Sequence, residues 1–134
     1  MINAIRQYFI DNFDQLDPNG PVGVDYLGDN PVSYAIEAGI SDPWIERYID
    51  GGGIKQYNFM LTSREFFGSE VTENIANLQF YYYIAEQVEL NNDNKIFPAV
   101  DGAYMVQVLT NGYVIETGAD SARYQIQLRL KYTV

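Results

Sequence analysis

The chain has no cysteine and no histidine. Without cysteine it forms no disulfide and offers no thiolate nucleophile, and sulfur gives no indication of its redox compartment. Without histidine, the Ser-His and Cys-His arrangements of nucleophilic catalysis are excluded. Ordinary zinc sites also lose their usual ligands. These two absences remove the most familiar catalytic and metal-binding constellations.

Long apolar runs are missing as well. No stretch approaches the roughly 20 residues that a helix needs to cross a bilayer, so no membrane partner is expected. The opening MINAIRQYFIDNF carries one arginine followed by acids, which does not match a secretory signal. We therefore expect a protein made and used in the cytosol, or inside an assembly built there.

Basic residues are scarce, with 8 Lys and Arg against 18 Asp and Glu, for a net charge of −10. Tight binding of DNA or RNA depends on clustered Lys and Arg, so no specific nucleic-acid binding is expected. Residues 1–43 hold seven acids against Arg6, whereas residues 121–134 hold three bases and no acid. These two regions either attract each other, within a subunit or between neighbours, or form solvated surface.

Aromatic residues are abundant, with 12 Tyr, 7 Phe and 1 Trp in 134 residues. Tyrosine adds large contact area with few rotatable bonds and keeps a hydroxyl group for water or a partner. This composition indicates either a half-buried sheet or a protein–protein surface. The length fits a single domain over residues 1–134, and no repeat or domain boundary interrupts it.

The clearest pattern is in residues 44–65, WIERYIDGGGIKQYNFMLTSRE. Alternation at period two places Tyr57, Phe59 and Leu61 on one face of a strand and polar residues on the other. The three glycines at residues 51–53 supply the positive φ that a tight reversal needs. This stretch predicts a β-hairpin at the centre of the fold.

Two segments have helical periodicity. In residues 1–16 apolar residues recur every three or four positions, and in residues 69–91 Ser69 is a plausible N-cap. Asparagine-rich residues 91–94 end the second helix. Its buried stripe is predicted to be Val71, Ile75, Leu78, Tyr82 and Ala85, widened by Ile84 and Val88. Because residues 80–83 are all aromatic, at least one ring is expected at the surface or under a neighbouring subunit.

Further strands are predicted at residues 22–27, 32–37, 103–109, 112–117 and 121–134. The last has the cleanest alternation, with Arg123, Arg129 and Lys131 on its polar face. That face is expected to be exposed to solvent or to lie against a polar partner. The order of elements predicts an α+β domain with a mostly antiparallel sheet and both helices on one face.

No residues form a recognisable catalytic, cofactor or metal site. Glu86 and Glu89 are three apart on a helix, which is typical of a solvated face. Residues 91–94 lack the acid, glycine and glutamate spacing of a calcium loop, and residues 51–53 lack the Lys-Ser/Thr of a phosphate loop. The arginines are expected to pair with nearby acids. We expect no enzyme activity and no cofactor.

Five segments resemble a known family. They are VDYL at 24–27, RYIDGGGIKQYNFML at 47–61, SRE at 63–65, ENIANLQFY at 73–81 and ARYQIQLRLKY at 122–132. Together they resemble the small minor capsid or tail-terminator proteins of long-tailed phages and prophages of Gram-positive bacteria. These segments are structural pieces in a shared order and carry no catalytic signature.

The resemblance implies an α+β subunit of the virion, assembled in the host cytoplasm. In this family the subunit closes into a ring, usually of six, at the head-proximal end of the tail tube. The ring stops growth of the tube and joins it to the head connector, so the implied partners are further copies of the chain, the major tail-tube protein and the connector. Heterologous contacts that close would make such a ring.

An acidic lumen, formed by the acids of residues 11–42, would keep exiting DNA from sticking. Polarity and position alone, without any carry-over from a family site, suggest the interface residues. They are Tyr81 and Tyr83 on the aromatic helix, Asp50 and Lys55 at the hairpin tip, and Arg123, Arg129 and Lys131 on the last strand. Two alternatives stay open: a head-completion or connector protein, and a small ligand-binding or enzymatic module.

Overall fold

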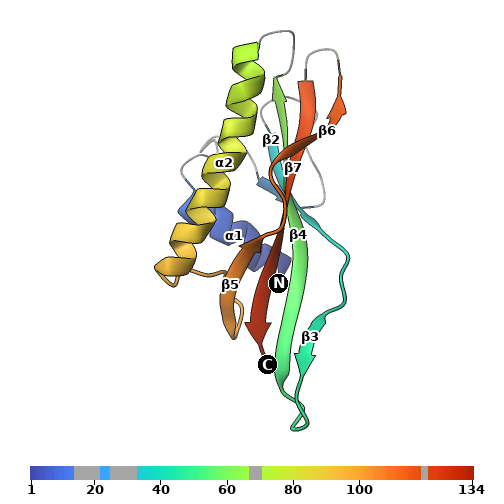
Figure 1. Cartoon of the computed structure of the whole chain (residues 1–134), viewed down its shortest axis with the longest axis vertical. Helices are drawn as coiled ribbons and strands as arrows, with labels where there is room; N and C mark the ends of the chain where they lie inside the picture. The colour runs from blue at the N-terminus through green and yellow to red at the C-terminus, as the bar shows by residue number, and fades with distance from the viewer. Residues whose placement is uncertain (14–21, 25–32, 67–70, 119–120) are drawn as a thin grey trace.

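The computed structural model describes residues 1–13, 22–24, 33–66, 71–118 and 121–134, and it has the predicted α+β architecture (Figure 1). The two helices are α1 (Ile2–Asn12) and α2 (Val71–Asp93). The strands are β1 (Val22–Val24), β2 (Ser33–Ala38), β3 (Trp44–Arg47), β4 (Gly53–Phe66), β5 (Ala103–Val108), β6 (Tyr113–Thr117) and β7 (Ser121–Thr133). Every element expected from the sequence is present, with shifts at the ends, and the proposed N-cap Ser69 lies outside the described residues.

The sheet is built on two long strands, β4 and β7. They pair antiparallel over thirteen residues, from Ile54 opposite Thr133 to Phe66 opposite Ser121. On the other side of β4 lie β2 and β3, one after the other, and on the other side of β7 lie β5 and β6. All of these pairings are antiparallel, and β1 extends the sheet by pairing parallel with β2. The second strand of the predicted hairpin, β4, is therefore one strand of a longer central ladder.

Each edge of the sheet is interrupted, between β2 and β3 beside β4 and between β5 and β6 beside β7, and the two interruptions lie at about the same position along the central strands. Between β2 and β3, the Gly39 N–H donates to the Asn58 carbonyl at 2.8 Å. Between β5 and β6, the Leu109 N–H donates to the Gln127 carbonyl at 2.8 Å, and the Gln127 N–H donates to Thr110 Oγ1 at 3.1 Å. These hydrogen bonds satisfy backbone groups where the regular ladder is interrupted.

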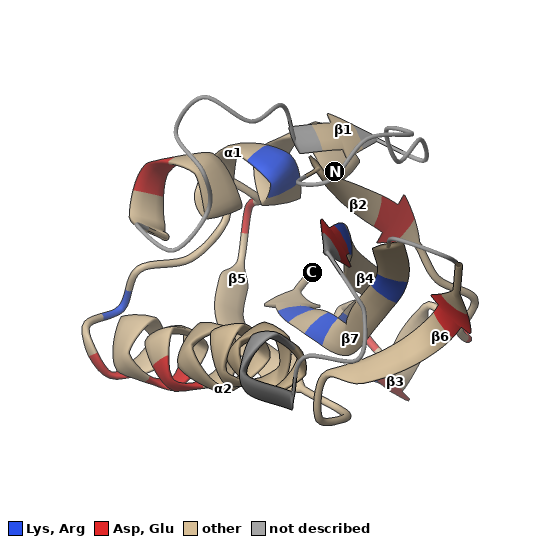
Figure 2. Ribbon diagram, turned by 90° about the horizontal axis from the view of Figure 1, so that it is seen from above, with Lys and Arg blue, Asp and Glu red and all other residues tan. Residues whose placement is uncertain are grey.

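Both helices lie on the same face of the sheet, as the sequence predicts (Figure 2). Alternation along β4 and β7 turns Phe59, Leu61, Ile126 and Leu128 toward the helices, where all four are buried. From α1, the ring of Phe9 packs edge-on against Phe59 with centroids 6.0 Å apart. The core is thus one apolar layer between the long strands and the two helices.

The predicted buried stripe of α2 is correct for Ile84, Val88 and the partly buried Ala85 and wrong for three other members, whereas the side chain of Val71 lies outside the described part of the chain. The helix turns Tyr81, Ile84 and Val88 into the core. Because α2 is apolar around most of its circumference, the same three-and-four spacing fits more than one face, and periodicity could not choose between them. The members of the predicted stripe that are exposed are Ile75, Leu78 and Tyr82.

Two asparagines at the end of α2, the buried Asn91 and the half-buried Asn92, fix this helix to its neighbours. The Asn91 side chain donates to the Tyr8 hydroxyl of α1 at 3.2 Å. The Asn92 side chain donates to the Val106 carbonyl at 2.8 Å and accepts from the Val106 N–H at 3.1 Å. The amide thus makes the two backbone hydrogen bonds that a residue of an adjacent strand would make with β5. The sequence predicts only that the helix ends here.

Two glycines are required by the backbone. Gly51 has a φ of +94° and its N–H donates to the Tyr48 carbonyl at 3.1 Å, which confirms the predicted glycine reversal between β3 and β4. Gly112, in the break between β5 and β6, lies directly against the Tyr81 side chain, where a Cβ atom would overlap the Cβ and Cγ atoms of the tyrosine. A side chain at Gly112 would push α2 away from the sheet.

We therefore expect Gly112→Ala to lower the free energy of unfolding by about 1–3 kcal/mol, the usual cost of forcing an extra methyl group into a packed site. Chemical denaturation followed by circular dichroism measures this change. Asn111→Ala, at the exposed neighbouring position, should stay within about 0.5 kcal/mol of the parent. Equal stability of the two variants would contradict the close packing of Gly112 on Tyr81.

Candidate functional site

The seven predicted interface residues lie in three regions. Tyr81 and Tyr83 are on α2, and Asp50 and Lys55 are in the hairpin formed by β3 and β4. Arg123, Arg129 and Lys131 lie on the far face, which is the face of the sheet turned away from the helices. The structure does not bring all seven together, so each region is considered in turn.

Tyr81 is a core residue, and its prediction as an exposed interface residue is wrong. Only 1% of it is exposed, and its ring stacks on that of Tyr124 with centroids 6.2 Å apart. Its hydroxyl lies 2.5 Å from Ser63 Oγ and donates to the Tyr124 carbonyl at 3.2 Å. The four aromatics at residues 80–83 do not reveal which ring faces the sheet, because the room for Tyr81 comes from the distant Gly112.

We expect Tyr81→Phe to destabilise the fold by about 1–2 kcal/mol, because the buried Ser63 hydroxyl and Tyr124 carbonyl lose their partner. The free energy of unfolding, from denaturant titration, measures this. The matched change Tyr83→Phe, on an exposed ring, should leave stability unchanged. A Tyr81→Phe protein as stable as the parent would mean that the buried hydroxyl contributes nothing.

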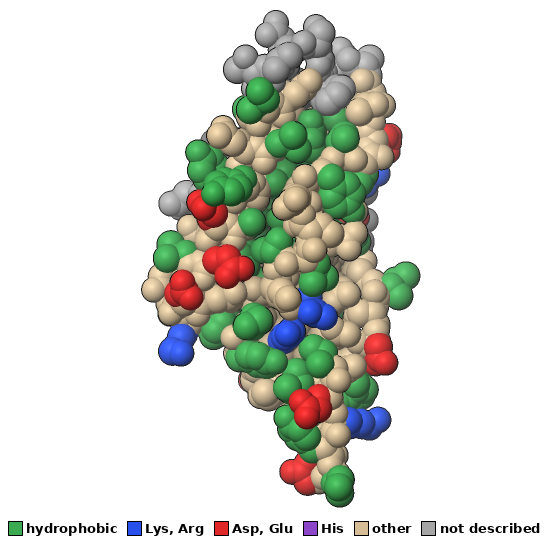
Figure 3. All heavy atoms as spheres, in the orientation of Figure 1, with side chains coloured by type: hydrophobic (Ala, Val, Ile, Leu, Met, Phe, Trp, Pro, Cys, Tyr) green, Lys and Arg blue, Asp and Glu red, His purple; other side chains and the backbone are tan. Residues whose placement is uncertain are grey.

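The outer face of α2 is the surface of this helix that is turned away from the core. It exposes 54% of Ile75, 49% of Leu78 and 60% of Tyr82, three large apolar side chains on successive turns. Figure 3 shows hydrophobic side chains over this helix interspersed with acidic ones. Soluble proteins rarely leave such a patch without a partner. The rest of the outer face comprises Tyr83, Glu86, Glu89, Leu90 and Asp93.

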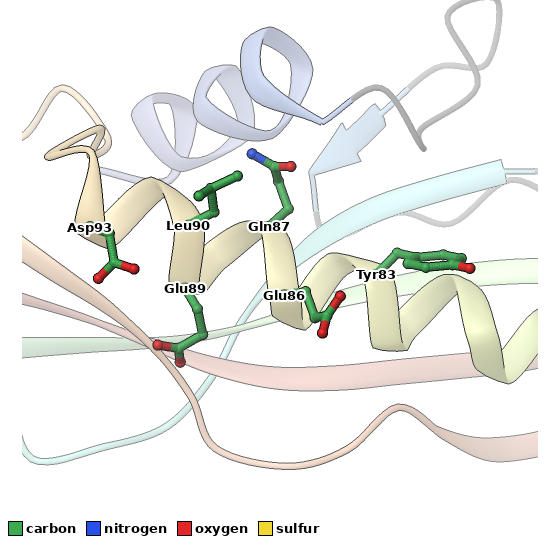
Figure 4. Close-up of a pocket in the computed structure, with 6 residues that line it drawn as sticks. All are labelled: Tyr83, Glu86, Gln87, Glu89, Leu90 and Asp93. Carbon is green, nitrogen blue, oxygen red and sulfur yellow. The ribbon is translucent and has the colours of Figure 1, made fainter.

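Residues of the outer face line an open groove of about 500 Å³ (Figure 4). Figure 4 shows Glu86 and Glu89 on one side of the helix and Leu90 on the side toward α1. Glu86 also accepts a hydrogen bond from Tyr82, which raises the pKa of this exposed phenol. Within the described residues, no group of three Asp, Glu, His or Cys side chains could hold a metal ion. The arrangement suits contact with a protein surface.

Tyr83 is exposed, as predicted. The expectation that at least one ring of residues 80–83 reaches the surface is also confirmed, by both Tyr82 and Tyr83. Ile75 and Leu78 are surface residues although they are predicted to be buried, and the sequence carries one signal of their exposure. A helix whose apolar residues exceed one stripe cannot bury all of them against a single sheet.

At the hairpin, the two predicted residues have structural roles. The Asp50 carboxylate accepts the Gly52 N–H at 3.0 Å and so orders the turn. The Lys55 ammonium lies 4.6 Å from the centre of the Trp44 ring, and the Arg47 guanidinium lies 4.4 Å from it. The hairpin projects beyond the body of the sheet (Figure 1). Its tip exposes Tyr48 and Ile49.

On the far face, Arg123 forms ion pairs with Glu37 of β2 and Glu116 of β6, each at 3.5 Å. The predicted pairing of this arginine with nearby acids is confirmed, and its contact with Glu37 joins the acidic first part of the chain to the basic end within one subunit. The remaining acids of residues 11–42 do not form one described surface. Asp11 is exposed on α1 and Asp42 accepts the Trp44 N–H, whereas positions 14, 17, 25 and 29 lie outside the described residues.

Arg129 has neutral partners. Its guanidinium donates to Gln56 at 2.9 Å and to Gln107 at 2.6 Å, and no described carboxylate pairs with it. Lys131 lies two residues further along β7, on the same face. This lower part of the far face therefore keeps its positive charge. Figure 3 shows basic side chains gathered over the sheet beside the acidic α2.

Beside Arg129, the break in the sheet edges leaves the far-face hollow, a depression of about 320 Å³. Its lining includes Ile40 and Leu109 from the two breaks, and Met60 from β4. Ile40 is fully exposed and Leu109 is partly exposed. The far face thus combines an apolar depression with adjacent cations that have no ion pair with a described carboxylate.

One ionisable group is buried near the upper end of the sheet. Glu65 of β4 is only 8% exposed. Burial raises its pKa to about 7, and a hydrogen bond with Ser63 opposes part of this rise. Between the ordinary glutamate value of 4.5 and about 7, the folded state therefore holds a proton that the unfolded chain has released.

This proton makes stability depend on pH. We expect the free energy of unfolding to fall by up to roughly 3 kcal/mol as the pH rises through this window, because the ionised Glu65 is disfavoured inside the fold. Glu65→Gln should remove this part of the pH dependence and be the more stable protein at pH 8. Urea titrations of both proteins from pH 4.5 to 8 measure the difference, and parallel pH profiles would contradict it.

Comparisons with known proteins do not identify the chain. No protein-family model matches it. No curated protein matches it either. Among the described helices, none is long and apolar enough to span a membrane.

Proposed function

We propose that this protein is a structural subunit of a phage or prophage virion. In this proposal, copies of the chain form a ring, of about six subunits by the family resemblance, at the head-proximal end of the tail tube. The ring stops polymerisation of the tube and presents a second surface to the head connector. The chain works by fitting against copies of itself and its neighbours.

The observation that carries the proposal is the outer face of α2. Ile75, Leu78 and Tyr82 are about half exposed on a helix that already buries another apolar side against the sheet. A helix with two apolar sides is suited to a position between its own sheet and another protein. This favours a subunit of an assembly over a solitary domain.

The segments that resemble tail-terminator proteins support the particular assembly. Residues 47–65 run from the end of β3 through most of β4, and residues 122–132 occupy most of β7. These two segments pair along the central ladder, and residues 73–81 form the first half of the helix that packs on it. The resemblance therefore covers one contiguous structural framework.

A head-completion or connector protein would need similar assembly surfaces with a different neighbour. The small-ligand alternative has less support, because the groove on α2 (Figure 4) and the hollow on the far face are both open to the surface. The neighbour of the ring in the virion is therefore the property to test.

The test is termination of tail tubes. Purified protein added to polymerising tail-tube subunits should shorten the tubes and appear at one end of each tube in negative-stain electron micrographs. The reason is that a ring bound to the growing end blocks the next layer of subunits. Tube length as a function of added protein gives the dose dependence.

Leu78→Asp is the informative variant, because it places a charge in the exposed patch. At least ten times more of this variant than of the parent should be needed to shorten the tubes to the same length. Asp11→Lys, on the exposed surface of α1, changes charge without touching the patch and should cap normally. Tubes of unchanged length, together with binding to isolated connectors, would assign the head-completion role instead. Binding to neither would overturn the proposal.

A further inference from the structure

We infer that the outer face of α2 in one copy packs on the far face of the next copy. This contact deepens the proposed function and rests on it, because a ring needs a surface by which each copy meets the next. Two observations point to this pairing: the charges of the two surfaces are opposite, and the apolar part of each has a counterpart on the other.

The charges of α2 are all of one sign. Residues 71–93 contain no lysine or arginine, and Glu86, Glu89 and Asp93 are exposed. On the far face, Arg129 is held by two glutamines and Lys131 has no ion pair with a described residue. A negative helix and a positive strand on the same chain are complementary when two copies meet.

The apolar parts also match. Near the middle of α2, Leu78 and Tyr82 are about half exposed. On the sheet, Ile40, Met60 and Leu109 line the far-face hollow. Seating Leu78 and Tyr82 in this hollow removes apolar side chains of both copies from water, which is the main favourable term in association.

The spacing along the two elements agrees. From Tyr82, a rise of 1.5 Å per residue puts Glu86 about 6 Å away and Glu89 about 10 Å away along the helix. From Gln127, at the hollow, a rise of 3.3 Å per residue puts Arg129 about 7 Å away and Lys131 about 13 Å away along β7. With Tyr82 at the hollow, the carboxylates of one copy reach the cations of the other.

The same charges disfavour two other kinds of partner. The carboxylates of the outer face repel the phosphates of nucleic acids and the anionic headgroups of a lipid surface. A second copy supplies the required cations itself. Because the two surfaces differ, the contact is heterologous, and repeated contacts close into a ring when the rotation permits.

The contact can be tested by reversing charges. Sedimentation velocity of the parent protein should show association that weakens as salt is raised from 50 to 500 mM. Glu89→Lys and Lys131→Glu should each weaken association about tenfold or more, because each places like charges across the contact. Circular dichroism and thermal unfolding show whether each variant remains folded.

Two rescue experiments distinguish the loss of this specific contact from a loss of association caused by a perturbed fold. A chain carrying both Glu89→Lys and Lys131→Glu should associate again, because the exchanged charges still face each other. Mixing the two single variants should also restore association, since their altered surfaces are complementary. Asp11→Lys makes the same change in net charge as Glu89→Lys at a distant site and should leave association intact.

Several results would overturn the contact. They are a parent that stays monomeric at every concentration and salt, association unaffected by Glu89→Lys and Lys131→Glu, or folded single variants that neither rescue restores. Tube capping that persists in both single variants would remove this contact and leave the proposed function standing. Self-association with charge rescue, but without any effect on tubes, would keep the contact and remove the capping role.

Discussion

The pairing of β4 with β7 is the interaction on which the rest of the structure depends. These strands come from distant parts of the chain and share thirteen paired residues, so they set the register of everything attached to them. One face of the ladder forms the floor of the core beneath α1 and α2. The other presents a row of polar and basic side chains. A slip of one residue would exchange the two faces, so the apolar face must be continuous along both strands.

Much of this framework could be predicted from the sequence. Period-two alternation in residues 44–65 and 121–134 predicts both long strands and their apolar faces, and the glycines at 51–53 predict the reversal before β4. What could not be predicted is that two short strands pair one after the other with each long strand, β2 and β3 with β4, and β5 and β6 with β7. The breaks near Gly39 and Leu109 are held by backbone hydrogen bonds to β4 and β7, which are contacts between segments far apart in sequence.

The candidate site was harder to predict, for a related reason. Hydrophobic spacing shows which residues share a side of a helix, but it does not show which side faces the sheet when several sides are apolar. In α2 that side is set by Gly112, which makes room for Tyr81, and by Asn91 and Asn92, which tie the helix to α1 and β5. With Tyr81, Ile84 and Val88 turned inward, Ile75, Leu78 and Tyr82 are left about half exposed. The surface of the helix is therefore decided by contacts that its own sequence does not contain.

The two faces of the sheet also explain how a stable fold and the proposed assembly surface can coexist in a small domain. The hydrophobic core lies on the helix side of the sheet. The far face can therefore hold charges whose neighbours are amides, as with Arg129 between Gln56 and Gln107. Such an arginine keeps its charge available across an interface, whereas Arg123 is already balanced by Glu37 and Glu116. Opposite charge along α2 then favours one partner over many, since complementary charge fixes orientation and rejects surfaces of like sign. In the proposed contact, specificity thus follows from which cations have no carboxylate partner among the described residues.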